Sequence, residues 1–243
     1  MSRLAEQSVS MSLYPLGISR SRDLPRLAEQ STRGGGVWHP HIPPTPGQVA
    51  VRWVLADKLA GAVIDAPQVP PKPLQHAAAL DAIHRRICVL PMRFGTQPRD
   101  EAEIRSLLET RHRDLLQRLD RLDGTCEMGL RIALLKCPTV QANPSPRTSP
   151  PTSYLHERRA YYQRQDSLGE QARLTVEHLV RELRGTFRDW QRLTPSPPGL
   201  VRLAFLVERE RVGFFQKRVE ASAAQRPKEQ RTLLGPWPPY SFV

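Results

Sequence analysis

Cysteine is scarce in this chain of 243 residues, and its spacing excludes the usual cysteine-based sites. Cys88, Cys126 and Cys137 are an odd number of cysteines and form no CxxC pair, which argues against a disulfide framework and a zinc site. We expect each to be a small buried apolar residue. No apolar run reaches the roughly 18 residues that span a bilayer, and the first residues lack the apolar core of a signal peptide. These absences indicate a soluble cytoplasmic protein.

Motifs of common catalytic and nucleotide-binding sites are also missing. The sequence contains no GxGxxG, GxxxxGK[ST], GxSxG or HExxH. The glycines Gly34–Gly36 lie in a proline-rich segment, and His39 and His41 have no Cys or acidic partner at ligand spacing nearby. We therefore expect no catalytic residue, no metal site and no cofactor, and a protein that is not an enzyme.

Positive charge is in excess, with 36 Lys and Arg against 24 Asp and Glu, for a net charge of +12. This balance permits binding to nucleic acid, to acidic surfaces or to anionic lipid. The basic residues are spread along the chain among acidic ones, and no basic block of five or more occurs. A basic nucleic-acid-binding protein is therefore the alternative function rather than the leading one.

Hydrophobic patterning before Gly124 predicts a mixture of strands and helices. Strands are predicted at Ser12–Ser19, on both sides of a turn within Gln48–Asp65, and at Cys88–Gly95. A helix is predicted at Leu74–Ile87, and a second begins at Asp100, which forms a capping box with Glu103, and ends at Gly124.

After Gly124 the predicted order is strand, helix, strand, strand, helix, strand, as in a ferredoxin-like domain. The segments are Glu127–Lys136, a long helix at Tyr154–Trp190 with a break at Gly169, Gln191–Thr194, Leu200–Val207, Glu210–Gln225 and Gln230–Pro236. The Pro, Ser and Thr residues of Pro138–Ser153 predict an exposed, mobile loop. The fold class is thus α+β in two domains, residues 1–123 and residues 124–243, the second a modified ferredoxin-like β-α-β-β-α-β unit with a long helix.

The chain ends in prolines and aromatic residues. Pro236, Pro238 and Pro239 disfavour helix and favour an extended or polyproline II path, in which Trp237 and Tyr240 project to the same side. We expect the two aromatic side chains to pack against the body of the protein as a closing clamp. The alternative is that they form an exposed contact surface.

Several stretches together resemble the gas vesicle GvpL/GvpF family. They are "LYPLGI" (Leu13–Ile18), "VLPMRFGT" (Val89–Thr96), "EIRSLLETRHRDLLQRLDRLDGTCEMGLRI" (Glu103–Ile132), "SYLHERR" (Ser153–Arg159) and "GPWPPYSF" (Gly235–Phe242). The similarity spans Met11 to Val243. The chain departs from the family pattern at Thr152-Ser153, where a glycine is usual, and in the many prolines of the preceding loop.

The resemblance implies a non-enzymatic minor component of gas vesicles that is required for their assembly. Its implied partners are the small hydrophobic shell protein GvpA and other gas vesicle proteins, and its implied location is the gas vesicle. The family-motif residues are candidates for partner binding: Arg93, Phe94, Gly95, Trp237, Pro238, Pro239, Tyr240 and Phe242. The structural alternative is that Gly95 supplies a backbone angle that other residues resist and that Arg93 pairs locally.

Overall fold

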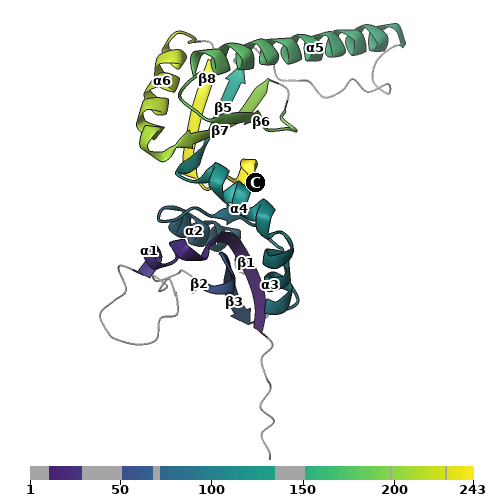
Figure 1. The fold of residues 1–243 in the computed structure, drawn as a ribbon. Helices are drawn as coiled ribbons and strands as arrows, with labels where there is room; N and C mark the ends of the chain where they lie inside the picture. Colours follow the sequence, from purple (N-terminus) through teal and green to yellow (C-terminus); the bar gives the residue numbers. More distant parts are fainter. Residues whose placement is uncertain (1–10, 29–50, 68–71, 135–150, 198, 228) are drawn as a thin grey trace, which may run out of the picture. The chain divides into compact units, whose positions relative to one another are not determined.

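The structure is a computed structural model that describes residues 11–28, 51–67, 72–134, 151–197, 199–227 and 229–243. The chain divides into two compact units (Figure 1): Met1–Thr125 with Trp237–Val243, and Cys126–Pro236. The tail therefore groups with the first unit, although the sequence analysis placed it in the second domain. Cys137, the glycine and histidine segment near residues 34–41, and most of Pro138–Ser153 lie outside the described residues.

The first unit contains a four-stranded antiparallel sheet of order β2-β3-β1-β4. The strands are β1 (Met11–Arg20), β2 (Val51–Ala56), β3 (Leu59–Pro67) and β4 (Leu90–Pro91). The predicted hairpin is confirmed, and Asp57 turns it with a φ of 49°. Only two residues of the predicted strand Cys88–Gly95 pair with β1, because the chain turns away after Met92.

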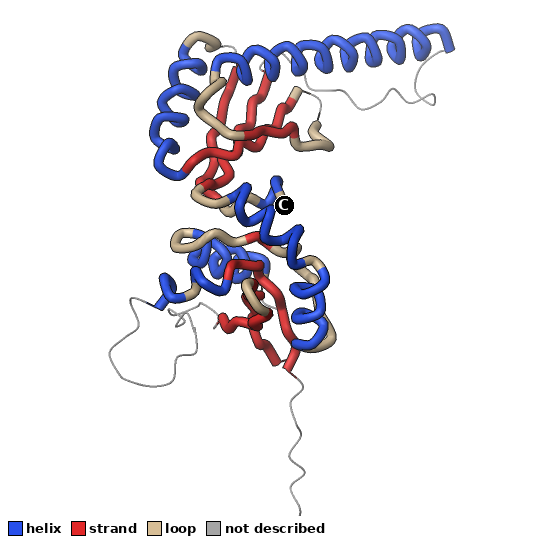
Figure 2. Tube along the Cα trace, viewed as in Figure 1, coloured by secondary structure: helices blue, strands red, loops and turns tan. Residues whose placement is uncertain are grey.

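Helices cover both faces of this sheet, as the helix and strand colouring of Figure 2 shows. On one side, Ala60, Ala62 and Ile64 of β3 share a core with α2 (Pro73–His84). On the other, Gly61 faces Ile104 and Leu108 of α3 (Glu101–Thr110). Because both faces of the sheet are covered, the central part of β3, Leu59–Ile64, is a continuous apolar run rather than an alternating one. The short elements η1 (Ser21–Asp23) and α1 (Pro25–Ala28) follow β1.

The predicted helix from Asp100 to Gly124 is two helices, which is a correction. Asp100 caps α3 by accepting a hydrogen bond from the Glu103 amide at 2.9 Å, as predicted. The Glu103 carboxylate accepts from the Arg99 amide at 2.8 Å rather than from the Asp100 amide, so the predicted capping box is only half formed. The helix then breaks at Arg111, and α4 (His112–Leu122) begins. Asp114 in the first turn of α4 pairs with Arg111 at 2.5 Å, where a carboxylate is favoured by the helix dipole.

The second unit contains another antiparallel sheet, of order β6-β7-β5-β8. Its elements run β5 (Thr125–Leu134), α5 (Pro151–Glu182), β6 (Asp189–Arg192), β7 (Leu200–Glu208), η2 (Arg209–Arg211), α6 (Val212–Ala224) and β8 (Glu229–Trp237). This is the predicted order, and the two apolar strands β5 and β7 are neighbours in one sheet.

The core of the second unit lies between this sheet and two helices. Alternate residues of β5 and β7 point to it, together with one face of α5 and of α6. Ala172, Val176 and Leu179 of α5, with Leu183 directly after its last residue, follow the spacing of an amphipathic helix. Figure 1 shows that α5 continues well beyond the strands it covers.

The predicted break at Gly169 is wrong, because α5 is continuous from Pro151 to Glu182. A glycine inside a helix costs only about 1 kcal/mol relative to alanine. Glu170, which the sequence analysis would place at the start of a new helix, instead pairs with Arg173 at 2.7 Å. That pair between residues three apart stabilises the continuous helix.

Candidate functional site: a pocket in the first unit

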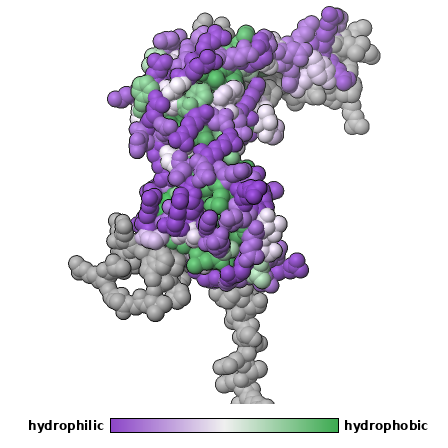
Figure 3. Space-filling view, in the orientation of Figure 1, coloured by the Kyte–Doolittle hydropathy of each residue, from purple (hydrophilic) through white to green (hydrophobic). Residues whose placement is uncertain are grey.

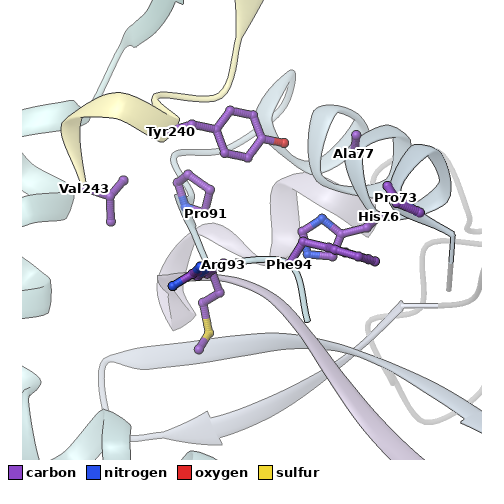
Figure 4. Close-up of a pocket in the computed structure, with 9 residues that line it drawn as sticks. Pro73, His76, Ala77, Pro91, Arg93, Phe94, Tyr240 and Val243 are labelled. Carbon is purple, nitrogen blue, oxygen red and sulfur yellow. The ribbon is translucent and has the colours of Figure 1, made fainter. Parts of the chain in front are cut away.

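A pocket of about 620 Å³ lies in the first unit, where three segments meet (Figure 4). Helix α2 contributes one wall, the segment after β4 a second, and the tail a third. The lining residues are Pro73, His76, Ala77, Pro91, Met92, Arg93, Phe94, Tyr240 and Val243. Most of these side chains are apolar, and the size is that of a typical ligand-binding pocket.

The "RFGT" motif forms a tight turn at the pocket wall. The backbone amide and the hydroxyl of Thr96 both donate to the carbonyl of Arg93, at 3.2 and 2.8 Å. Gly95 has a φ of +85°, which glycine adopts without steric cost. The predicted backbone role of Gly95 is therefore confirmed. The turn leaves the side chains of Arg93 and Phe94 exposed.

The tail is anchored by its prolines rather than by its aromatic residues. Pro238 and Pro239 are buried, whereas Trp237 and Tyr240 remain 40% and 45% exposed. Backbone hydrogen bonds from Tyr240 to Pro238 and from Phe242 to Pro239 close the short helix η3 (Tyr240–Phe242). The prediction that Trp237 and Tyr240 bury themselves as a clamp is wrong. Proline loses little conformational entropy when it is ordered, so burial of Pro238 and Pro239 can hold the segment in place.

His76 stands at the inner wall of the pocket, with 5% of its surface exposed. Its ring hydrogen-bonds to the backbone of Pro15, and it forms a T-shaped pair with the ring of Phe94, with 5.3 Å between ring centroids. Its Nε2 has no hydrogen-bond partner in the described part of the chain. Burial lowers the pKa of His76 below 6.5, and the bond to Pro15 opposes this only in part.

The lowered pKa of His76 predicts a loss of stability in mild acid. Between pH 6.5 and the lower pKa of the folded state, the unfolded chain takes up a proton at His76 before the folded chain does. The free energy of unfolding therefore falls as the pH falls through this window. Urea titrations of the wild type and His76→Asn should show a shallower pH dependence in the variant, whose amide can still donate to Pro15. Parallel pH curves would contradict this.

The structure brings together three of the candidate residues at the pocket: Arg93, Phe94 and Tyr240. The other candidates, Gly95, Trp237, Pro238, Pro239 and Phe242, shape the two segments without lining it. Whether any of them binds a partner stays a prediction.

Sequence analysis missed the α2 wall of the pocket. His76 lies four residues before Leu80, seven before Ile83 and eleven before Ile87, which is helical spacing on the predicted apolar face. That spacing was the available signal for a buried histidine.

Outside the pocket, no other candidate site stands out among the residues that the structure describes. On the face shown in Figure 3, hydrophilic residues cover most of the described surface of each unit. Cys88 and Cys126 are buried, as predicted, and neither forms a disulfide bond within the described residues. Burial raises the pKa of Cys126 to about 11. Among the described residues, no cluster of His, Cys, Asp or Glu could hold a metal ion. No helix in the described ranges is long and apolar enough to cross a membrane.

Comparison with known proteins identifies the family. The model of the gas vesicle synthesis protein GvpL/GvpF family matches residues 27–243, which include every segment that lines the pocket. The chain belongs to the GvpL/GvpF family. Gas vesicle protein L of Streptomyces sp. (strain CB03234) is 31% identical over 69% of this chain and 67% of that protein. Gas vesicle protein F of the same strain is 29% identical over 96% of this chain and 100% of that protein.

Solved structures of GvpF proteins share the fold. The crystal structure of GvpF from Anabaena sp. PCC7120 superposes with a TM-score of 0.70 at 18% identity, over 96% of both chains. That of GvpF from Microcystis aeruginosa gives 0.68 at 15% identity, over 96% of this chain and 99% of the other. At these identities the comparison shows the fold alone, and it extends over both units.

Proposed function

We propose that this GvpL/GvpF family member is a non-enzymatic accessory or minor structural protein of gas vesicles, and that it acts in their assembly by binding the shell protein GvpA. One observation carries the proposal. The two most distinctive family motifs, "RFGT" and "GPWPPYSF", are about 140 residues apart in the sequence, yet both contribute side chains to one pocket. Phe94 and Tyr240 hold large aromatic rings exposed there, as interface residues do.

An apolar pocket with exposed aromatic side chains suits a hydrophobic partner. Burying these rings against an apolar subunit would remove their surface from water, which is favourable by about 25 cal/mol per Å². The proposed location is the gas vesicle within the cytoplasm, and the proposed partners are GvpA and other gas vesicle proteins. No cofactor is needed for such a role.

We also propose that the two compact units are two domains, and that the second has a modified ferredoxin-like fold. Its element order β5-α5-β6-β7-α6-β8 supports this proposal. So does its strand order, in which β7 and β5 lie at the centre and β6 and β8 at the edges. The unusual length of α5 is the modification.

Substitution of either exposed ring is expected to weaken GvpA binding. Phe94→Ser and Tyr240→Ser should each reduce the GvpA that co-purifies with the tagged protein by about tenfold, the effect of a moderate interface hot spot. Both side chains are half exposed, so thermal stability should change little. Leu55→Ser is the matched control, since Leu55 is similarly exposed in the same unit but does not line the pocket.

The co-purification results distinguish an error in the proposed binding surface from an error in the proposed function. If GvpA co-purifies equally with all three variants, the pocket is not the binding surface. If the wild type retains no GvpA, the function itself is wrong. Retention of nucleic acid that disappears steeply with added salt would instead favour the alternative function.

A further inference from the structure

The pocket contains a charged side chain as well as apolar ones, and this charge restricts the chemistry of a ligand. Arg93 is the one charged side chain among the lining residues. Its guanidinium forms no hydrogen bond or ion pair with any residue in the described ranges. By contrast, Arg52 in the same unit binds Asp65 at 2.6 Å and Glu101 at 3.0 Å. No acidic side chain lines the pocket, so no side chain of the wall pairs with the positive charge of Arg93.

The other side chains of the wall do not supply a second positive charge. His76 is kept neutral at pH 7 by burial, which lowers its pKa. The other lining side chains are Pro, Ala, Met, Phe, Tyr and Val. A phosphate group usually needs several cations or a row of backbone amides, which this wall does not offer. One arginine above an apolar cavity instead matches a carboxylate beside an apolar side chain.

We propose that the pocket binds an acidic, amphipathic segment of the partner protein. This inference rests on the proposed function and names the chemistry of the partner at the same site. An apolar side chain of the segment fills the space between α2, Phe94 and Tyr240, and a carboxylate close to it in sequence pairs with Arg93. The planar guanidinium can hold a carboxylate with two parallel hydrogen bonds. The net charge of +12 attracts acidic segments from a distance.

A display selection tests this and assumes nothing about the sequence of the segment. A library of random peptides is panned on the full-length protein and, in parallel, on Arg93→Glu and Tyr240→Ser, each checked for folding by circular dichroism. Peptides enriched on the wild type should carry Asp or Glu next to aromatic or aliphatic residues. Arg93→Glu should lose that acidic preference, and Tyr240→Ser should lose enrichment altogether. Enrichment of the same acidic peptides on Arg93→Glu would overturn the proposal.

A pairwise measurement then assigns the contact to Arg93. The strongest selected peptide and its Glu→Gln analogue are titrated against the wild type and Arg93→Gln by fluorescence anisotropy. The wild type should prefer the acidic peptide by about fivefold, the upper range for an exposed ion pair, and Arg93→Gln should not discriminate between the two. Equal discrimination by both proteins would refute the pairing.

Different results would contradict the proposed acidic segment and the proposed function. If Tyr240→Ser loses GvpA and Arg93→Glu retains it in full, the acidic segment is wrong and the proposed function stands. If neither variant affects GvpA, the pocket is wrong as the site of both. Binding of phosphatidylserine vesicles that depends on Arg93, with no peptide enriched, would also overturn the inference.

Discussion

Gly17→Ala is expected to destabilise the first unit by about 3 kcal/mol, the upper part of the range for overpacked cores. A Cβ at Gly17 would lie 2.6 Å from Cγ2 of Val89 and 2.7 Å from the backbone oxygen of Leu90. The backbone oxygen cannot move aside by changing rotamer, so β1 and β4 must separate. Because total stabilities are about 5–15 kcal/mol, this loss is large. Hydrogen exchange of β1 and β3 amides would measure it.

Gly61→Ala is the control in the same sheet. Its Cβ would meet only side-chain atoms at close range, with Cγ2 of Ile104 at 3.1 Å. A shift of a few tenths of an ångström in that side chain relieves the contact, so the cost should be clearly smaller. Equal protection in the two variants would show that the approach of β4 to Gly17 is not as tight as described. The prediction matters for function, because β4 leads directly into the Arg93 turn.

Phe215→Ala is expected to cost about 3–5 kcal/mol in the second unit, as large-to-small changes of buried aromatic residues do. Phe215 is fully buried, and its ring packs against Phe205 with 5.2 Å between centroids. Phe205 in turn packs against Phe187 at 5.1 Å. Removal of Phe215 therefore leaves a cavity at one end of an aromatic row between α6 and β7. Urea unfolding followed by exchange in β7 would report the loss.

The neighbouring residue provides a matched control. Phe214 lies on the same helix but is 51% exposed, and the guanidinium of Arg211 lies 5.8 Å from the centroid of its ring. Phe214→Ala should cost about 0.5–1 kcal/mol, the value of an exposed cation–π contact. If the two variants unfold at the same urea concentration, the core of the second unit is not centred on Phe215.

In the proposed binding site, the tail would contribute its aromatic rings to a partner, while its buried prolines hold it on the first unit. Pro238 and Pro239 are buried, and the rings of Trp237 and Tyr240 are 40% and 45% exposed. A partner can then use those rings at little conformational cost, since the segment is already ordered. The clamp expected from the sequence would have buried both rings against the body of the protein.

Most elements could be predicted because their signals are local. Apolar alternation in β5 and β7, the helical face of α5 and the cap at Asp100 all depend on residues within a few positions of one another. The positive φ of Gly95 and Gly124 follows from glycine at a turn and at a helix end. The errors at Arg111 and Gly169 came from marginal signals, where a helix break costs or gains only about 1 kcal/mol and packing decides.

The pocket could not be predicted as a whole, because its walls come from α2, the segment after β4 and the tail. Arg93, Phe94 and Tyr240 were identified as motif residues, but nothing local indicates that they meet. In the sequence, His76 is not distinguished from other helical histidines, because its contacts, Phe94 and the backbone of Pro15, come from segments distant in sequence. The buried Arg20 is a similar case: its carboxylate partners Asp120 and Asp123 lie about 100 residues away, and only the packing of α4 brings them near.

The sequence by itself determined the family, the order of strands and helices after Gly124, and the turn that Gly95 makes, since short-range sterics and hydrophobic periodicity act through neighbouring residues. The tertiary structure alone decided that the tail joins the first unit, that its prolines rather than its aromatic rings are buried, and that Arg93 has no carboxylate partner among the described residues. Each of these features depends on which segments, far apart in the sequence, pack closely against one another in the folded chain.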